Sequence, residues 1–325
     1  MTSILTNASA TSALQVLRSI SSHMGETQRH VSSGLRVGAA SDNAAYWSIA
    51  TTMRSDNMAI SAVRDALGLS SAVLDTTYAA VETSIEIMAE ITARLVAAQE
   101  EGVDRSKINE ELSQFKQQLQ STMDAASFSG QNWLSWNNVK DSEDKHIVSS
   151  FIRNSDGSIS LGTIDYTINT PLPRTSTDVQ YFVDNGGSGE YGILSSEAFA
   201  VQAGSNVNYV LILGATAPAS AVELTIGDAT TSTELDDMIS TVEAMTKQMV
   251  SVASQIGSIS ARVESQSEFA IKLMDGIDSG IGRLVDADMN EGSTRLKALQ
   301  TQEQLAIQSL SIANANAENI LTLFR

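Results

Sequence analysis

Residues 235–284 decide the fold: LDDMISTVEAMTKQMVSVASQIGSISARVESQSEFAIKLMDGIDSGIGRL. Counting alternately three and four residues from Leu235 to Leu284 selects apolar side chains or alanine at every step except Gln266 and Gly280. A 3-4 spacing sustained over that length predicts a coiled-coil seam on one helix, roughly 75 Å long at the α-helical rise. Ordinary globular domains have much shorter helices, so this helix needs partner helices along its length.

Composition narrows the classes of function. The chain has 325 residues, 42% of them hydrophobic, and a net charge of −18. That acidity argues against nucleic acid and anionic membranes as partners, although it could equally serve solubility alone. There is no cysteine, which excludes disulfides, thiol catalysis and cysteine metal sites. We find no secretory signal and no apolar run long enough to span a membrane, which indicates a cytoplasmic protein unless export uses another route.

The periodicity divides the chain into helical flanks and a middle insert. We expect a mainly α protein, in which both chain ends form a long antiparallel helical coiled-coil or bundle rod around a small β-rich insert. The expected segments are 1–40 (terminal helix), 41–138 (first half of the rod), 139–228 (insert), 229–285 (second half of the rod) and 286–325 (terminal helix).

The long seam finds its expected partners within the same chain. A second helix starts after a cap at Ser41 or Asp42 and runs to about Gln99, with a break near Gly68. A third helix starts at Asp104 or Ser106. The seam residues expected to pack against these two helices are Val242, Met249, Val252, Ile256, Ile259, Val263, Leu273 and Ile277.

Both terminal segments carry weaker apolar stripes. Ser21 and Gln28 interrupt the first stripe, and alanines occupy part of the last one. Helices of this kind depend on packing for stability, so the first should stay disordered until something covers it. The two terminal helices can pair only with each other or with another copy. The stripe residues are Leu14, Leu17, Met24, Val31, Leu35, Leu296, Leu299, Leu310, Ile320, Leu323 and Phe324.

The insert holds all three prolines, and strand-like runs alternate with turns in it. The expected strands are 147–152, 159–161, 164–168, 179–183, 207–213 and 222–226, with a turn at 154–157. Trp133 and Trp136 should cover the junction between the rod and the insert. We expect a separable domain, whose removal would leave assembly intact.

Several short sequence motifs resemble ligand-binding or metal-binding sites but lack residues that those sites require. Residues 187–192 match G-x-G-x-x-G, but no helical pattern follows, which favours a surface turn over a dinucleotide site. Asp286 and Asp288 begin like a calcium loop, but glutamate stands at the sixth position and lysine at the twelfth, where the loop requires glycine and glutamate. His23 and His30 lack the partners that a zinc site needs. We predict no catalytic residue, no metal, no cofactor and no enzymatic activity.

Three motifs in order resemble those of bacterial flagellins. Residues 29–37 read RHVSSGLRV and precede ASDNAA at 40–45, which is similar to the flagellin amino-terminal signature. DADM at 286–289 resembles the family's D-x-D turn, and ANANAENILTLFR at 313–325 resembles its carboxyl end. The resemblance covers about 1–138 and 230–325 and is closest to alphaproteobacterial flagellins with a short variable domain.

The resemblance implies a structural subunit that polymerises into the flagellar filament for swimming motility. The terminal helices would then be inner-core helices that pack between subunits, and 139–228 would be the variable, surface-exposed domain. The family is secreted unfolded by type III export, and its partners are other flagellin copies, an export chaperone, and cap and junction proteins. The resemblance implies no partnership with nucleic acid or membrane.

Three other functions compete with this one. A hook–filament junction protein of the same superfamily would share the helical ends but match the signatures less closely. A chemoreceptor shaft would need a membrane span or an adaptor-binding tip, and we find neither. An enzyme would need a convergent polar constellation in the insert, which the sequence does not offer.

Overall fold

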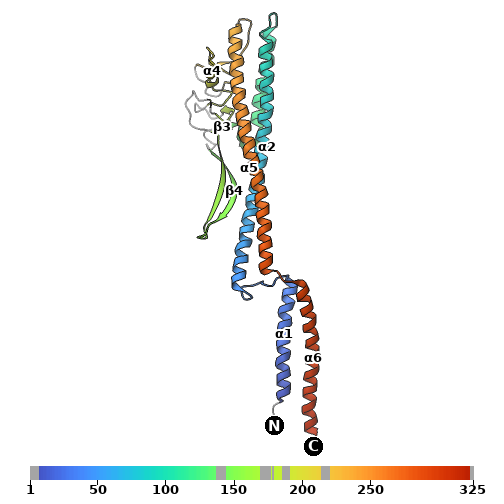
Figure 1. Cartoon of the computed structure of the whole chain (residues 1–325). Helices are drawn as coiled ribbons and strands as arrows, with labels where there is room; N and C mark the ends of the chain where they lie inside the picture. Colours follow the sequence, from blue (N-terminus) through green and yellow to red (C-terminus); the bar gives the residue numbers. More distant parts are fainter. Residues whose placement is uncertain are drawn as a thin grey trace. The chain divides into compact units, whose positions relative to one another are not determined.

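The computed structural model describes residues 7–136, 144–168, 177, 179–184, 191–213 and 220–322. It is mainly helical, with a small strand-containing insert between helices from both chain ends, as predicted (Figure 1). The helices are α1 (Ala8–Ser33), α2 (Ala44–Ala97), α3 (Arg105–Ala125), α4 (Ala198–Ala203), α5 (Ser232–Val285) and α6 (Met289–Thr322). The strands are β1 (Ser127–Phe128), β2 (Gln131–Asn132), β3 (Ser135–Trp136), β4 (Asp144–Arg153), β5 (Ile159–Thr167), β6 (Val183–Asp184), β7 (Tyr209–Val210) and β8 (Val222–Glu223).

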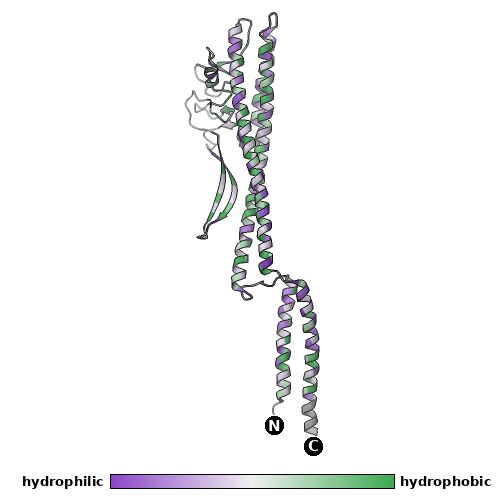
Figure 2. Cartoon of the chain, in the orientation of Figure 1, coloured by the Kyte–Doolittle hydropathy of each residue, from purple (hydrophilic) through white to green (hydrophobic). Residues whose placement is uncertain are grey.

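The chain forms two compact units, one from 1–59 with 273–325 and one from 60–272. Both boundaries fall inside the long helices α2 and α5, so they differ from the segment limits expected from the sequence. Hydrophobic and hydrophilic residues alternate at short intervals along both helices (Figure 2). This is the pattern of helices that bury one stripe and expose the rest.

One hydrophobic core runs through the unit of residues 60–272. It joins side chains of α2, α3 and α5 to side chains of the insert, including Trp133, Phe182 and Phe199. The indole of Trp133 stacks on the Tyr166 ring at 5.5 Å, and Trp136 lies 6.0 Å from Tyr181. Both tryptophans are buried where the helices meet the insert, as predicted. Because the insert completes the helices' core, it is not a separately packed domain.

The insert has less regular structure than its alternating pattern predicts. Strands β4 and β5 form an antiparallel hairpin over the first expected strands. The other described pairs are two residues long, and the short helix α4 was not expected. The segments expected as later strands contain only β6, β7 and β8. The G-x-G-x-x-G string lies largely outside the described residues.

Two details of α2 differ from the sequence-based expectation. The helix continues through Gly68 without a break, because the buried Leu67 and Leu74 on either side hold it in the core; such packing outweighs the roughly 1 kcal/mol that glycine costs a helix. The cap is Asn43, whose side chain accepts hydrogen bonds from the amides of Ala45 and Tyr46. The carboxylate of Asp42 instead accepts from the Gly38 and Ala39 amides. In α3, by contrast, Asp104 caps the helix as predicted.

Candidate subunit-packing surface

The seam on α5 is buried over most of its length and then changes register. Val242, Met249, Val252, Ile256, Ile259 and Val263 are all buried. Leu273, however, is 36% exposed and Ile277 is half-buried, whereas Ile281 and Val285 are buried. Leu273, which was expected on the seam, is therefore more exposed than the seam residues before it. A nearly straight α-helix turns once in 3.6 residues, so its buried stripe drifts away from a strict seven-residue repeat.

The unit of residues 1–59 and 273–325 brings the two chain ends together. Within it, α1 and α6 pack along each other. Asn7 caps α1 by accepting from the Ala10 amide, and its side-chain amide donates to the Ala313 carbonyl at 2.9 Å. The terminal stripes therefore pair within one chain, which is one of the two possibilities that their sequence left open.

A backbone clasp between residues 34–37 and 284–287 holds the two ends together. Leu35 bridges to Asp286, and the amides of Arg36 and Val37 both donate to the Val285 carbonyl. The Ala287 amide donates to the Gly34 carbonyl at 2.9 Å, and the Arg36 guanidinium donates to the Leu284 carbonyl at 2.9 Å. The clasp overlaps the SSGLR string (32–36) and the DAD string (286–288), so these two motifs meet in space.

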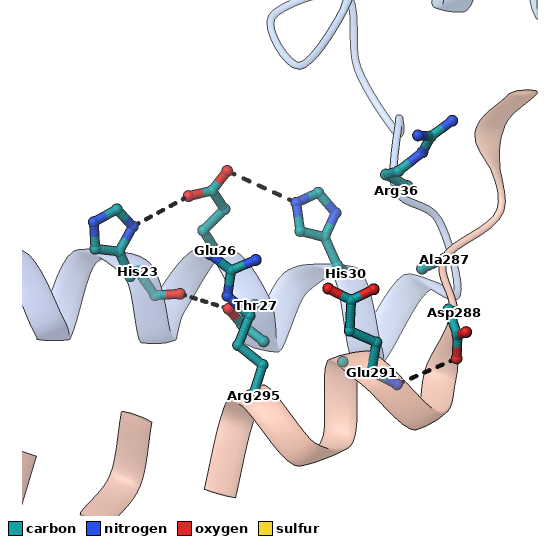
Figure 3. A pocket seen from close by; sticks show the side chains of 10 residues that line it. His23, Glu26, Thr27, His30, Arg36, Ala287, Asp288, Glu291 and Arg295 are labelled. Atoms are coloured by element: carbon teal, nitrogen blue, oxygen red, sulfur yellow. Dashed lines mark hydrogen bonds and ion pairs between the residues drawn. The ribbon is translucent and has the colours of Figure 1, made fainter. Parts of the chain in front are cut away.

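Beside the clasp, charged side chains of α1 and α6 line an open cleft of about 220 Å³ (Figure 3). Glu26 lies 3.9 Å from His23 and 3.8 Å from His30. Glu291 and Arg295 line it from α6. Positive and negative groups are mixed here, and within the described ranges no group of His, Asp and Glu side chains could hold a metal ion. The ion pairs in this cleft lie within α1, and Glu291 and Arg295 of α6 face the same cleft.

Pairing of the terminal helices covers their predicted stripes only in part. Leu299 is buried, while the others that can be assessed are half-buried: Leu14, Leu17, Met24, Val31, Leu35, Leu296 and Leu310. Leu323, Phe324 and the side chain of Ile320 lie outside the described residues. This stripe is thus partly covered where α1 and α6 of one chain pack on each other.

A second apolar set on the same helices points away from the pair. Val16 of α1 is exposed, and on α6 Leu305 is 56% exposed and Ile312 is 63% exposed. Ile307 is also exposed. Leu305 and Ile312 are seven residues apart and so share a helix face. The sequence stripe did not include these residues; the heptad spacing of Leu305 and Ile312 was the signal that could have found them.

Comparison with known proteins decides the family. Residues 4–139 match the bacterial flagellin N-terminal helical region, and residues 239–324 match the bacterial flagellin C-terminal helical region. The chain belongs to the flagellin family. It is similar over its whole length, and the whole length of each relative, to Flagellin C (51% identical) and Flagellin D (47%) of Rhizobium meliloti (strain 1021), and to a flagellin of Brucella melitensis biotype 1 (36%).

As a flagellin, the chain is a structural subunit of the flagellar filament. The family is one of structural filament proteins rather than of enzymes. The relatives are of the alphaproteobacterial type that the sequence motifs indicated. In the described part of the chain, no helix is long and apolar enough to cross a membrane. Residues 140–238 fall outside both family regions, and they include the β4–β5 hairpin.

Proposed function

We propose that this flagellin polymerises through its clasped terminal helices, with the outward apolar face of α1 and α6 as the contact between copies. The observation that carries the proposal is the exposure of Leu305 and Ile312 on a helix whose other apolar stripe is already used by α1. Burying one large aliphatic side chain contributes roughly 1.5–3 kcal/mol. Several such side chains per subunit favour association once a neighbour is present.

The contact we propose is heterologous, so the same two surfaces repeat along a growing polymer. A heterologous contact that does not close into a ring produces a helical filament. The predicted stripe residues keep a role in this arrangement, because they hold α1 against α6 and thereby orient the outward face.

The location and partners belong to the same proposal. We infer that the chain is secreted and forms extracellular filaments, leaving the cell by type III export. The absence of cysteine suits a chain that crosses a channel unfolded. An export chaperone would cover the apolar terminal helices before export, and cap and junction proteins would contact the filament at its ends. The insert would face the medium.

Substitution of Ile312 by aspartate tests the contact. Ile312→Asp places a charge on the outward face, and Ser311→Asp places the same charge on an adjacent exposed residue without removing an apolar group. We expect Ile312→Asp to abolish polymerisation of purified protein, as seen by negative-stain microscopy, and Ser311→Asp to form filaments. Leu310→Asp should also block filaments, and it should weaken α1–α6 packing as well. Normal filaments from Ile312→Asp would contradict the proposed surface.

A further inference from the structure

The turn of the β4–β5 hairpin contains a chemically reactive pair of residues, Asp156 and Gly157. The Asn154 amide donates to the Ser158 carbonyl at 2.9 Å, and the Gly157 amide donates to the Asn154 carbonyl at 3.0 Å, so hydrogen bonds close the turn. Gly157 has φ of 84°, in the left-handed region, and the turn therefore favours glycine at this position. Asp156 is exposed. The turn thus places an exposed aspartate directly before a glycine.

An Asp–Gly pair can rearrange, because glycine has no side chain that hinders attack by its own nitrogen. The Gly157 nitrogen bonds to Cγ of Asp156, while the carboxyl OH and the amide proton leave as water, and a cyclic succinimide results. One water molecule then opens the ring, and opening at the α-carbonyl gives isoaspartate. The main chain then runs through Cβ and Cγ and contains one additional carbon. This change would fall beside Arg153 and Ile159, the last pair of the hairpin.

Hydrogen bonds hold both reacting groups in place. Oδ1 of Asp156 accepts from the Ser158 amide at 2.9 Å and from the Ser158 hydroxyl at 2.7 Å. The same hydroxyl accepts from the side-chain amide of Asn154 at 2.9 Å. The attacking atom, the Gly157 nitrogen, has its proton in the hydrogen bond to the Asn154 carbonyl. Both reacting groups must therefore leave hydrogen bonds before the new bond to Cγ can form.

We propose that Asp156 is a latent site of aspartate isomerisation and that Ser158 protects it by holding its carboxylate. The side-chain hydrogen bond from Ser158 also keeps the pKa of the Asp156 carboxyl below its ordinary value. The group therefore stays ionised, and an ionised carboxylate loses its oxygen less readily than a protonated carboxyl. Protection matters in a filament subunit, because slow chemical damage accumulates in a protein that stays in place after assembly.

Removal of the Ser158 hydroxyl tests the protection. After prolonged incubation of the folded protein at neutral pH, peptide mapping by mass spectrometry measures isoaspartate at position 156. Ser158→Ala should raise its rate of formation about two- to tenfold, the rate equivalent of one hydrogen bond. Ser158→Thr keeps a hydroxyl and should isomerise as slowly as the unchanged protein. The matched control is Ser155→Ala, which removes an exposed neighbouring hydroxyl that has no hydrogen-bond partner among the described residues.

The second Asp–Gly pair of the chain, Asp275–Gly276, is an internal reference in the same digest. It lies inside α5, where helical hydrogen bonds hold the glycine amide, so its isoaspartate content should be equal in all folded variants. A rise at both pairs in Ser158→Ala would indicate global unfolding and contradict the proposal.

Three further outcomes would overturn the protection by Ser158. One is an unchanged rate at position 156 in Ser158→Ala. Another is a rate in Ser158→Thr as high as that in Ser158→Ala, because the hydroxyl would then not be the protecting group. The last needs no variant: if the unchanged protein isomerises at Asp156 as fast when folded as when unfolded in urea, the turn gives no protection.

Discussion

Single residues determine whether the two chain ends can be clasped. Gly34 ends α1 with φ of 72°, in the left-handed region, and its amide donates to the His30 carbonyl. The next residues supply the hydrogen bonds to 284–287, so the direction of the chain at Gly34 sets the whole clasp. A Cβ at this position would meet no atom within 4 Å. Backbone conformation, rather than space, is therefore the reason for glycine here.

Gly34→Ala should destabilise the clasp by about 1 kcal/mol, because an L-residue resists the left-handed conformation. Gly25→Ala is the matched control: it also meets nothing within 4 Å, but it lies inside α1 with ordinary helical geometry. It should stabilise α1 by roughly 0.5–1 kcal/mol. Amide hydrogen exchange of α1 in the monomer measures both effects. Equal changes in the two variants would contradict this account of Gly34.

At the scale of an element, α5 begins with a reciprocal capping box. The Thr231 amide donates to the Glu234 carboxylate at 2.7 Å, and the Glu234 amide donates to the Thr231 hydroxyl at 3.3 Å. The hydrogen bond from the Thr231 amide holds the pKa of Glu234 below its ordinary value. A folded-state pKa below the unfolded value contributes stability above the unfolded pKa, and that contribution is lost as the pH falls through the folded value.

Glu234→Gln should therefore lower the urea midpoint at pH 7 and lose its effect in acid. The difference from the unchanged protein should shrink as the pH falls below about 4.5 and vanish once the carboxyl is protonated. Glu243→Gln is the control, since it removes an exposed carboxylate that pairs with Lys247 on the surface of the same helix. A pH-independent effect of Glu234→Gln would mean that the charge of the carboxylate is not what stabilises the cap.

At the scale of the whole molecule, the insert and the helices share one core. Phe199 of α4 is fully buried in the hydrophobic cluster that contains Val252 and Ile256 of α5. Deleting the insert would remove its side chains from this cluster, and the expectation that assembly survives such a deletion stays a prediction. The structure therefore predicts that truncating a buried side chain of the insert also destabilises the helices that share its core.

Phe199→Ala should lower the free energy of unfolding of the unit of residues 60–272 by about 3–5 kcal/mol, the usual cost of truncating a buried phenylalanine. Val201→Ala, on the same short helix but exposed, should change it by no more than about 0.5 kcal/mol. Urea unfolding followed by circular dichroism reports the helical signal. Full retention of helix stability in Phe199→Ala would show that the insert and the helices unfold independently.

The sequence alone determined the long helices, the helical class and the family. The apolar spacing from Leu235 to Val263 indicates a helix with one buried stripe. The motifs at the chain ends are short continuous sequences, so they can be recognised without the structure. Their meeting in the clasp could not be predicted, because hydrogen bonds between Arg36 and Leu284 join residues far apart in the chain. For the same reason, periodicity could show that Leu310 lies on an apolar stripe but not that α1 already covers part of it.

Only the tertiary structure decided which apolar residues remain available to a partner. The sequence of an apolar stripe does not reveal whether the side chains that pack on it belong to the same chain or to another copy. Burial of Leu299 and exposure of Leu305 and Ile312 depend on where α1 lies, and burial of Phe199 depends on how the insert packs. Spacing along a helix specifies a face, whereas the neighbour of that face is set by contacts between distant segments.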